Sequence, residues 1–201
     1  MTRLSPTGPE FRSGYVAIVG QPNVGKSTLM NRLVHSRLAI VSPKPQTTRR
    51  RILGIVSGEG HQIILLDTPG ILDPKYPLQK AMMKTVSSVL SDADVACLLL
   101  DGQASSPGRL GIPEEVVHFG GPRVAVVNKI DVVRPKEKMI PILQELGETG
   151  LFADIVPLSA LTGEGVDGLI PILAGHLPVA PPFYPADQIT EQPERLSLIH
   201  I

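Results

Sequence analysis

The residue types with the clearest chemical meaning lie in a glycine-rich segment near the start of the chain. Residues 20–27 read Gly-Gln-Pro-Asn-Val-Gly-Lys-Ser and match the pattern G-x-x-x-x-G-K-[ST] at every fixed position. Such glycines let the backbone wrap around a phosphate group, with its N–H groups pointing inward at a helix N-terminus. Lys26 would contact the β- and γ-phosphates, and the Ser27 hydroxyl would bind Mg²⁺. The residues expected to surround the phosphates are Gly20, Gln21, Pro22, Asn23, Val24, Gly25, Lys26, Ser27 and Thr28.

A second motif would select the base, since the glycine-rich segment alone leaves ATPase, kinase and GTPase activity open. Asn128, Lys129 and Asp131 directly follow the apolar run 124–127. The Asp131 carboxylate can accept hydrogen bonds from the ring N–H and the exocyclic amine of guanine, each worth about 1.5–3 kcal/mol. Adenine presents an acceptor at the corresponding ring nitrogen and is rejected. A backbone N–H of a small-residue segment is expected to bind the guanine carbonyl oxygen; its residues are Ser159, Ala160 and Leu161.

Two further segments are predicted to respond to the γ-phosphate. Asp67 would hold Mg²⁺ through water, and the Gly70 N–H would bond the γ-phosphate, with Thr68 and Pro69 between them. In the polar loop 36–50, the hydroxyl of Thr47 or Thr48, with Thr48 favoured, would complete the Mg²⁺ shell while the γ-phosphate is present. The loop 36–50 and the segment after Gly70 are therefore candidates for ordering by the γ-phosphate. The predicted catalytic residues are Lys26, Thr48, Gly70 and Asn23, and the predicted metal ligands are Ser27, Thr48 and Asp67.

Alternating strands and helices are predicted to position these residues. The predicted strands are 15–19, 51–56, 62–66, 95–100, 124–127 and 155–158; the predicted helices are 26–36, 78–90, 114–118, 136–146 and 166–176. Four strands are continuous apolar runs, which is typical of parallel strands covered by helices on both faces. The turn signal at 57–60 predicts a hairpin. We therefore predict an α/β chain with a P-loop GTPase fold, whose doubly wound, mostly parallel six-stranded sheet has one antiparallel edge hairpin.

The distribution of proline and charge predicts the domain organisation and the setting. We expect a flexible N-terminus over 1–13, a GTPase domain over 14–177 and a proline-rich linker over 178–201, where the density of proline excludes a helix or a central strand. The net charge is zero, and the single cysteine, Cys97, cannot form an internal disulfide. No apolar run approaches the roughly 20 residues of a membrane span. We predict a soluble, cytoplasmic monomer without a transmembrane segment; peripheral membrane association stays open.

Taken together, these motifs resemble translation-factor-class GTPases and, more narrowly, the bacterial Era family of ribosome-assembly GTPases. The similarity covers residues 14–195, and the motifs that carry it are residues 20–28, 42–49, 67–71, 159–167 and 184–195. It implies a GTP-binding and GTP-hydrolysing switch that acts in small ribosomal subunit assembly and 16S rRNA maturation. The implied cofactor is Mg²⁺, and the implied partners are GTP or GDP, the small ribosomal subunit and 16S rRNA. Other ribosome- or tRNA-associated relatives typically have Pro-Gly-Thr-Thr-Arg-Asp where this chain has Pro-Gln-Thr-Thr-Arg-Arg.

The resemblance also implies a C-terminal KH domain that binds the 3′ region of small-subunit ribosomal RNA. After Arg195 this chain ends Leu-Ser-Leu-Ile-His-Ile, which we expect to be a truncation or a foreign terminus. The G-x-x-G sequence at 147–150 contains a glutamate, which an RNA-clamping loop cannot use, so we interpret it as a helix-ending turn.

The source of hydrolytic activation is an open question in the sequence. Ras-like GTPases place a water-orienting glutamine directly after Asp-x-x-Gly. This chain has Ile71 and Leu72 there, and neither side chain can bond a water, so slow intrinsic turnover is expected. In potassium-activated relatives an asparagine at the position of Asn23 helps to hold K⁺, which makes K⁺ a second candidate cofactor; the alternative is that Asn23 only shapes the loop.

Two alternatives to a hydrolysing switch remain open at this point. The first is a GTP- or GDP-binding module of a related ribosome- or tRNA-associated GTPase with negligible intrinsic turnover. The second is another P-loop class, such as a nucleotide kinase. Single-turnover hydrolysis would separate the first from the switch, and a competition between guanine and adenine nucleotides would test the second.

Overall fold

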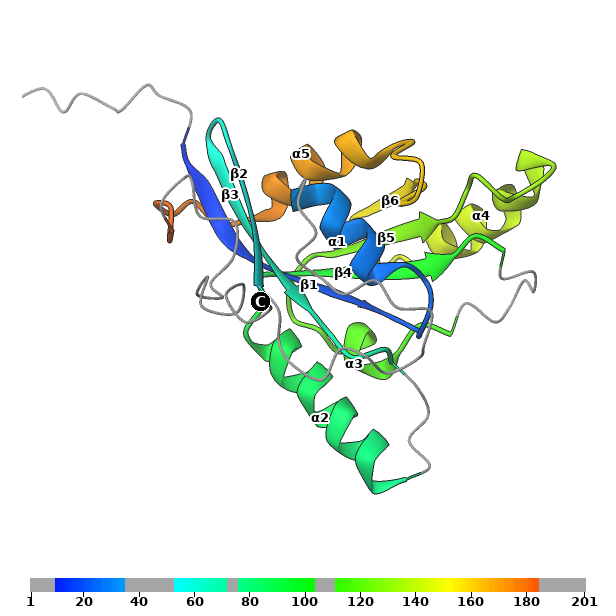
Figure 1. Cartoon of the computed structure of the whole chain (residues 1–201), viewed down its shortest axis with the longest axis horizontal. Helices are drawn as coiled ribbons and strands as arrows, with labels where there is room; N and C mark the ends of the chain where they lie inside the picture. The colour runs from blue at the N-terminus through cyan, green and yellow to red at the C-terminus, as the bar shows by residue number, and fades with distance from the viewer. Residues whose placement is uncertain (1–9, 35–52, 72–75, 104–110, 185–201) are drawn as a thin grey trace, which may run out of the picture.

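The computed structural model describes residues 10–34, 53–71, 76–103 and 111–184, which form one six-stranded sheet with helices on both faces (Figure 1). The strands are β1 (Arg12–Gly20), β2 (Leu53–Gly58), β3 (His61–Asp67), β4 (Val95–Asp101), β5 (Arg123–Asn128) and β6 (Asp154–Pro157). The helices are α1 (Lys26–Val34), α2 (Pro77–Ser91), α3 (Glu114–Val117), α4 (Ile140–Glu148) and α5 (Val166–His176), with a 3₁₀ helix, η1 (Lys136–Met139), before α4.

The sheet is parallel except at one edge. Its strand order is β2-β3-β1-β4-β5-β6, and β2 pairs antiparallel with β3 while every other pairing is parallel. The hairpin turns at Glu59 and Gly60, and Gly60 has φ +73°, which glycine adopts without strain. The predicted fold class is therefore confirmed, including the antiparallel edge hairpin.

Alternate residues of the central strands explain why both faces are covered. In β1, Val16 and Ile18 face a core shared with α1 and α5, whereas Ala17 and Val19 face a core shared with α2 and α4. Because successive side chains of a strand point to opposite faces, a strand that is apolar at every position needs helices on both sides. Figure 1 shows α1 and α5 on one face of the sheet, with α2 and α3 on the other. None of the helices in the described part of the chain is both long and apolar enough to span a membrane.

Two elements differ most from the sequence-based boundaries, while the other described element ends lie within two residues of the predicted ones. The first strand begins at Arg12 rather than at residue 15, because β1 continues in register with β3 through Arg12 and His61. The helix predicted over 136–146 is divided into η1 and α4, and α4 extends to Glu148. Pro141, in the first turn of α4, has no N–H to continue a helix from the preceding residues, but it can begin one.

Residues 178–184, which we call the C-terminal strap, lie against the start of β1. Val179 forms an antiparallel bridge with Arg12, and the buried Ser13 donates its hydroxyl proton to Pro181 O at 2.6 Å. The rings of Tyr15 and Phe183 lie 5.5 Å apart. Although its prolines exclude a helix, the first part of the predicted linker is therefore held on the domain by hydrogen bonds.

Gln62, near the start of β3, fastens the far end of the strap. Its side chain is 1% exposed, and its Oε1 accepts the N–H groups of Phe183 and Tyr184 at 2.8 and 3.0 Å. Its Nε2 donates to Tyr184 O at 2.9 Å and to Ser57 Oγ at 3.1 Å. All the donor and acceptor groups of this buried amide thus have partners.

We expect Gln62→Ala to lower the free energy of unfolding by about 1–3 kcal/mol, because the substitution leaves two partly buried N–H groups without their acceptor. Urea denaturation of the whole chain measures the change. Gln144→Ala, at an exposed position of α4, is the matched control and should change stability by less than about 0.5 kcal/mol. Equal small effects of the two substitutions would show that the strap adds nothing to stability.

Candidate nucleotide-binding site

Four of the predicted site segments follow the carboxyl ends of parallel strands. The glycine-rich loop follows β1, residues 67–70 end and follow β3, residues 128–131 end and follow β5, and residues 159–161 follow β6. Since β1, β3, β5 and β6 run in the same direction, these segments meet at one edge of the sheet. Ligands of open α/β sheets bind at this edge.

The glycine-rich loop requires glycine at both of its fixed positions. A Cβ at Gly20 would lie 2.5 Å from the carbonyl oxygen of Leu99, and a Cβ at Gly25 would overlap the Asn128 amide. Asn23, at φ +64°, adopts the left-handed conformation that asparagine tolerates better than most residues, and its side chain is exposed. Helix α1 begins directly after the loop, with Leu29 N donating to Gly25 O at 2.9 Å.

Lys26 lies inside the glycine-rich loop. It is 8% exposed, and its Nζ donates to Gly20 O at 3.1 Å and to Gln21 O at 2.9 Å. Burial lowers the pKa of Lys26 to about 8, because a desolvated ammonium is disfavoured, and the Asp67 carboxylate partly offsets this effect. A phosphate that entered the loop would add a further negative charge beside this buried cation.

The segment after β3 is fixed against the glycine-rich loop. The Thr68 hydroxyl donates to Ile18 O at 2.8 Å, and Ile71 N donates to Gly20 O at 2.9 Å. Gly70 lies so close to Pro22 that a Cβ would come within 2.8 Å of its Cγ. Gly70 is therefore adjacent to the loop that would hold the phosphates.

The residues present fit a magnesium ion by their chemistry. The Ser27 hydroxyl and the buried Asp67 carboxylate, which is 1% exposed, supply the oxygen ligands that Mg²⁺ prefers. In the described ranges, no group of three or more His, Cys, Asp or Glu residues could form a metal site made only of side chains. A magnesium ion here would therefore keep waters and phosphate oxygens among its ligands.

Asn128 connects the two ends of the site. Its side chain is 2% exposed, Nδ2 donates to Val24 O in the glycine-rich loop at 2.7 Å, and Oδ1 accepts from Ala160 N at 2.9 Å. One amide therefore holds together three segments that are remote in sequence.

One oxygen of the Asp131 carboxylate, the group expected to recognise the base, is buried. Among the described residues, Asp131 Oδ1 is a buried side-chain oxygen that has no hydrogen-bond partner. Such an atom is unfavourable unless a donor reaches it. Guanine offers an N–H and an amine, so this oxygen fits the predicted ligand.

Two residues of the site were missed by sequence reasoning. Asp101, the last residue of β4, accepts a hydrogen bond from Lys129 Nζ at 2.7 Å, and Lys129 itself has φ +66°. Arg32 of α1 donates to the carbonyl oxygens of Ala160 and Leu161. Asp101 could have been found because it ends an apolar run, as Asp67 and Asn128 do. No pattern in the sequence connects Arg32 with residue 160.

Thr48 lies outside the described residues, as do the rest of the loop 36–50 and Leu72. Its predicted role in the metal shell stays a prediction. The remaining predicted residues lie in the four segments at the carboxyl edge of the sheet.

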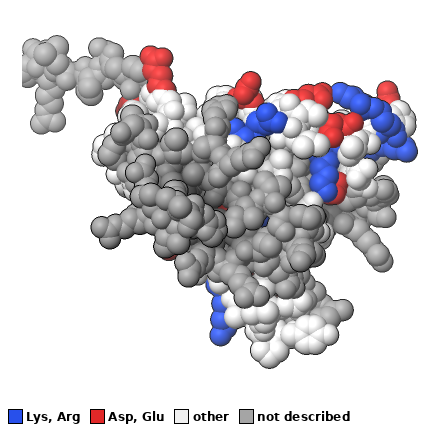
Figure 2. All heavy atoms as spheres, in the orientation of Figure 1, with Lys and Arg blue, Asp and Glu red and all other residues white. Residues whose placement is uncertain are grey.

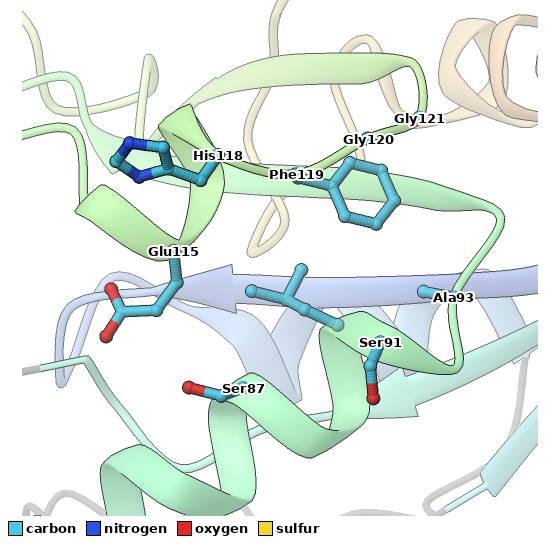
Figure 3. Close-up of a pocket in the computed structure, with 9 residues that line it drawn as sticks. Ser87, Ser91, Ala93, Glu115, His118, Phe119, Gly120 and Gly121 are labelled. Atoms are coloured by element: carbon cyan, nitrogen blue, oxygen red, sulfur yellow. The ribbon is translucent and has the colours of Figure 1, made fainter.

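A separate pocket of about 460 Å³ lies between the end of α2 and the segment from α3 to β5 (Figure 3). Its walls include Leu90, Ala93 and Phe119, with Glu115 and His118 toward α3. It lies beside the amino ends of β4 and β5, away from the edge described above. None of the predicted site residues lines this pocket.

Comparison with known proteins gives a consistent picture. The sequence profile of the family described as 50S ribosome-binding GTPase matches residues 15–129. GTPase Era from Alkaliphilus metalliredigens is 44% identical over 192 residues, which are 95% of this chain and 65% of that protein. GTPase Era from Syntrophus aciditrophicus is 42% identical over 186 residues, which are 92% of this chain and 60% of that protein.

Solved structures agree with these similarities. A crystal structure of Era in complex with MgGDPNP and nucleotides 1506–1542 of 16S ribosomal RNA has a TM-score of 0.83 and 39% identity, and the match covers 92% of this chain and 64% of that chain. A crystal structure of an Aquifex aeolicus Era variant bound to GDP·AlF₄⁻ gives the same values. The chain thus spans between 60% and 65% of the length of these similar proteins.

Proposed function

This chain belongs to the family of 50S ribosome-binding GTPases, and on that premise we propose that it binds GTP with Mg²⁺ and hydrolyses it to GDP and phosphate. The observation that carries the choice of base is the buried Asp131 oxygen without a hydrogen-bond partner in the described residues. The buried ammonium of Lys26 within the glycine-rich loop supports phosphate binding at the other end of the same site.

In the proposed complex, some residues of this chain would bind the nucleotide and others would orient the residues that bind it. Lys26 and the loop N–H groups would hold the phosphates, Gly70 N–H would bond the γ-phosphate, and Asn128 would keep the base and phosphate ends in register. Ser27 and Asp67, together with Thr48, are the proposed ligands of Mg²⁺, which when bound neutralises phosphate charge. Thr28, Pro22 and Pro69 are proposed to shape the surrounding walls.

Competition binding tests the proposal directly. Unlabelled GTP, GDP and ATP are titrated against a fluorescent GDP derivative bound to the whole chain, and phosphate release is followed under single-turnover conditions. GTP and GDP should displace the probe far better than ATP, and GTP should be consumed. Binding without measurable phosphate release would support the alternative of a guanine-nucleotide module with negligible turnover. Equal competition by ATP would contradict the guanine assignment.

A role in small ribosomal subunit assembly is the proposed biological setting. Its support is the similarity to Era proteins, including the one crystallised with a 16S ribosomal RNA fragment. On the face seen in Figure 2, acidic and basic side chains of the described residues lie interspersed. Co-sedimentation with small subunits, with GTP or GDP present, tests the partner. The proposed compartment is the cytoplasm, and a monomeric state stays a prediction that sedimentation velocity can check.

Potassium activation is a further part of the proposal. Ile71, which follows Gly70, is buried and cannot orient a water, so charge on the transferring phosphoryl group needs another source of stabilisation. The exposed side chain of Asn23 is the proposed ligand of a K⁺ beside the phosphates.

We expect K⁺ to accelerate single-turnover hydrolysis at least about tenfold over Na⁺ at equal ionic strength, below the 10³–10⁵-fold effect of an arginine finger. Asn23→Gly, which keeps the left-handed backbone, should abolish the difference between the two salts. Equal rates of the unmodified chain in both salts would reject the K⁺ site while leaving GTP hydrolysis itself in place.

A further inference from the structure

Arg32 links the helix that follows the phosphate loop to the segment that would face the base. It lies on α1, and its Nε donates to Ala160 O at 3.3 Å while its Nη2 donates to Leu161 O. The guanidinium group holds its donors in a fixed fork, so it can hold two successive carbonyl groups in one orientation. Arg32 is 128 residues before Ala160 and 129 residues before Leu161 in the sequence.

The loop that Arg32 contacts is otherwise closed on itself. Ser159 N donates to Glu164 O and Gly163 N donates to Ser159 O, both at 2.8 Å, and Thr162 N donates to Ser159 Oγ at 3.1 Å. Ala160 N already donates to Asn128 Oδ1. Residues 159–164 all belong to the described part of the chain, and Leu161 is the residue among them whose backbone N–H donates no hydrogen bond to the protein.

The geometry of a peptide unit connects these two observations. Ala160 O and the Leu161 N–H belong to the same peptide, which is trans and planar, so the two groups point in opposite directions. When Arg32 fixes Ala160 O on the side of α1, it turns the Leu161 N–H away from α1.

We propose that Arg32 is a positioning residue for base specificity, which orients the peptide between Ala160 and Leu161 so that the Leu161 N–H donates to the carbonyl oxygen of guanine. This inference rests on the proposed binding of guanine nucleotides. Arg32 itself touches no nucleotide in this arrangement. Its side chain is exposed, and an exposed charge contributes little to stability alone. Its effect should therefore show in ligand recognition more than in folding.

The test compares GDP with two analogues that change one edge of the base at a time. In 6-thio-GDP a thiocarbonyl, a poor acceptor, replaces the carbonyl oxygen, while the N–H and amine remain. IDP keeps the carbonyl oxygen but lacks the amine that Asp131 would bind. Dissociation constants of all three are measured for the whole chain, for Arg32→Ala and for Lys136→Ala. Lys136 is the matched control, because it pairs with Glu164 of the same loop at 2.9 Å and does not touch the carbonyl groups of 160 and 161.

For Arg32→Ala we expect GDP affinity to fall about fivefold to tenfold, as for loss of one well-oriented hydrogen bond. The preference for GDP over 6-thio-GDP should fall by a similar factor, while the preference for GDP over IDP stays unchanged. Lys136→Ala should leave all three affinities as they are. Thermal unfolding of each variant establishes that it is folded, and Arg32→Gln takes the place of Arg32→Ala if the alanine variant is not.

Two outcomes would overturn the inference. Unchanged GDP affinity in Arg32→Ala would show that the peptide is held without Arg32. A loss of equal size for GDP, 6-thio-GDP and IDP would assign Arg32 a general structural role instead. If the unmodified chain binds none of the three nucleotides, the proposed function itself fails, which is a distinct result.

Discussion

Replacing Lys26 with alanine is expected to weaken GTP binding about a hundredfold or more. The Nζ group now bonds two carbonyl oxygens of the loop and would transfer to the β- and γ-phosphates, where bonds between charged groups are worth about 1.5–3 kcal/mol each. Two such bonds correspond to at least about two orders of magnitude in dissociation constant. Isothermal titration of GTP and GDP into the whole chain measures the loss.

The stability of this variant separates loss of binding from loss of fold. Burial already disfavours the charge of Lys26, as its lowered pKa shows, so the alanine variant should unfold no more readily than the unmodified chain. Lys84→Ala removes an exposed lysine from α2 and is the matched control. Unchanged GTP affinity and turnover in folded Lys26→Ala would refute the assignment of the phosphate site.

Replacing Asp131 with asparagine is expected to change the preferred base from guanine to xanthine. Xanthine carries a carbonyl oxygen where guanine has its amine, and an asparagine amide can donate to that oxygen while still accepting the ring N–H. GTP affinity should fall about tenfold to a hundredfold, since one charge-assisted bond worth about 1.5–3 kcal/mol is replaced by an unfavourable contact. XTP affinity should rise over the same range. Competition of GTP and XTP against a fluorescent nucleotide measures both changes.

The exposed Asp167 in the first turn of α5 supplies the control for this exchange. Asp167→Asn makes the same chemical change at an exposed position and should leave the ratio of GTP to XTP affinity as it was. If Asp131→Asn still prefers GTP over XTP, then the buried Asp131 oxygen does not recognise the base, and the guanine-specific part of the proposed function falls.

The sequence predicted most of the sheet because its signal is local. Runs such as 95–100 are apolar at every position, and each is buried on both faces of the sheet. The glycine-rich loop was equally predictable, since backbone curvature requires glycine at residues 20 and 25. Because parallel strands bring their carboxyl ends to one edge, motifs scattered over 140 positions could be assigned to a single site.

What the sequence could not predict depends on contacts between distant polar residues. The strap was interpreted as linker because prolines exclude regular structure, but Gln62 and Ser13 hold it through hydrogen bonds to its backbone. Every residue has a backbone carbonyl group, so the pattern of side chains in the strap does not indicate that its backbone forms hydrogen bonds with Gln62 and Ser13. The same holds for Arg32, whose partners are the carbonyl groups of a remote loop.

The position of β1 in the sheet has a consequence for how this domain is made. It is the first strand of this sheet to be synthesised, yet it lies between β3 and β4. Its edge toward β3 therefore stays open until residue 67 has been added, and its edge toward β4 stays open until residue 101 has been added. At about 5–20 residues per second, that interval lasts about 4–16 s after residue 20. The hydroxyl of the buried Ser13 in β1 gains its hydrogen-bond acceptor later still, when Pro181 of the strap has been added. During translation the apolar β1 is therefore an exposed segment that favours chaperone binding or aggregation, and slowing elongation between residues 20 and 101 should lower the yield of folded protein.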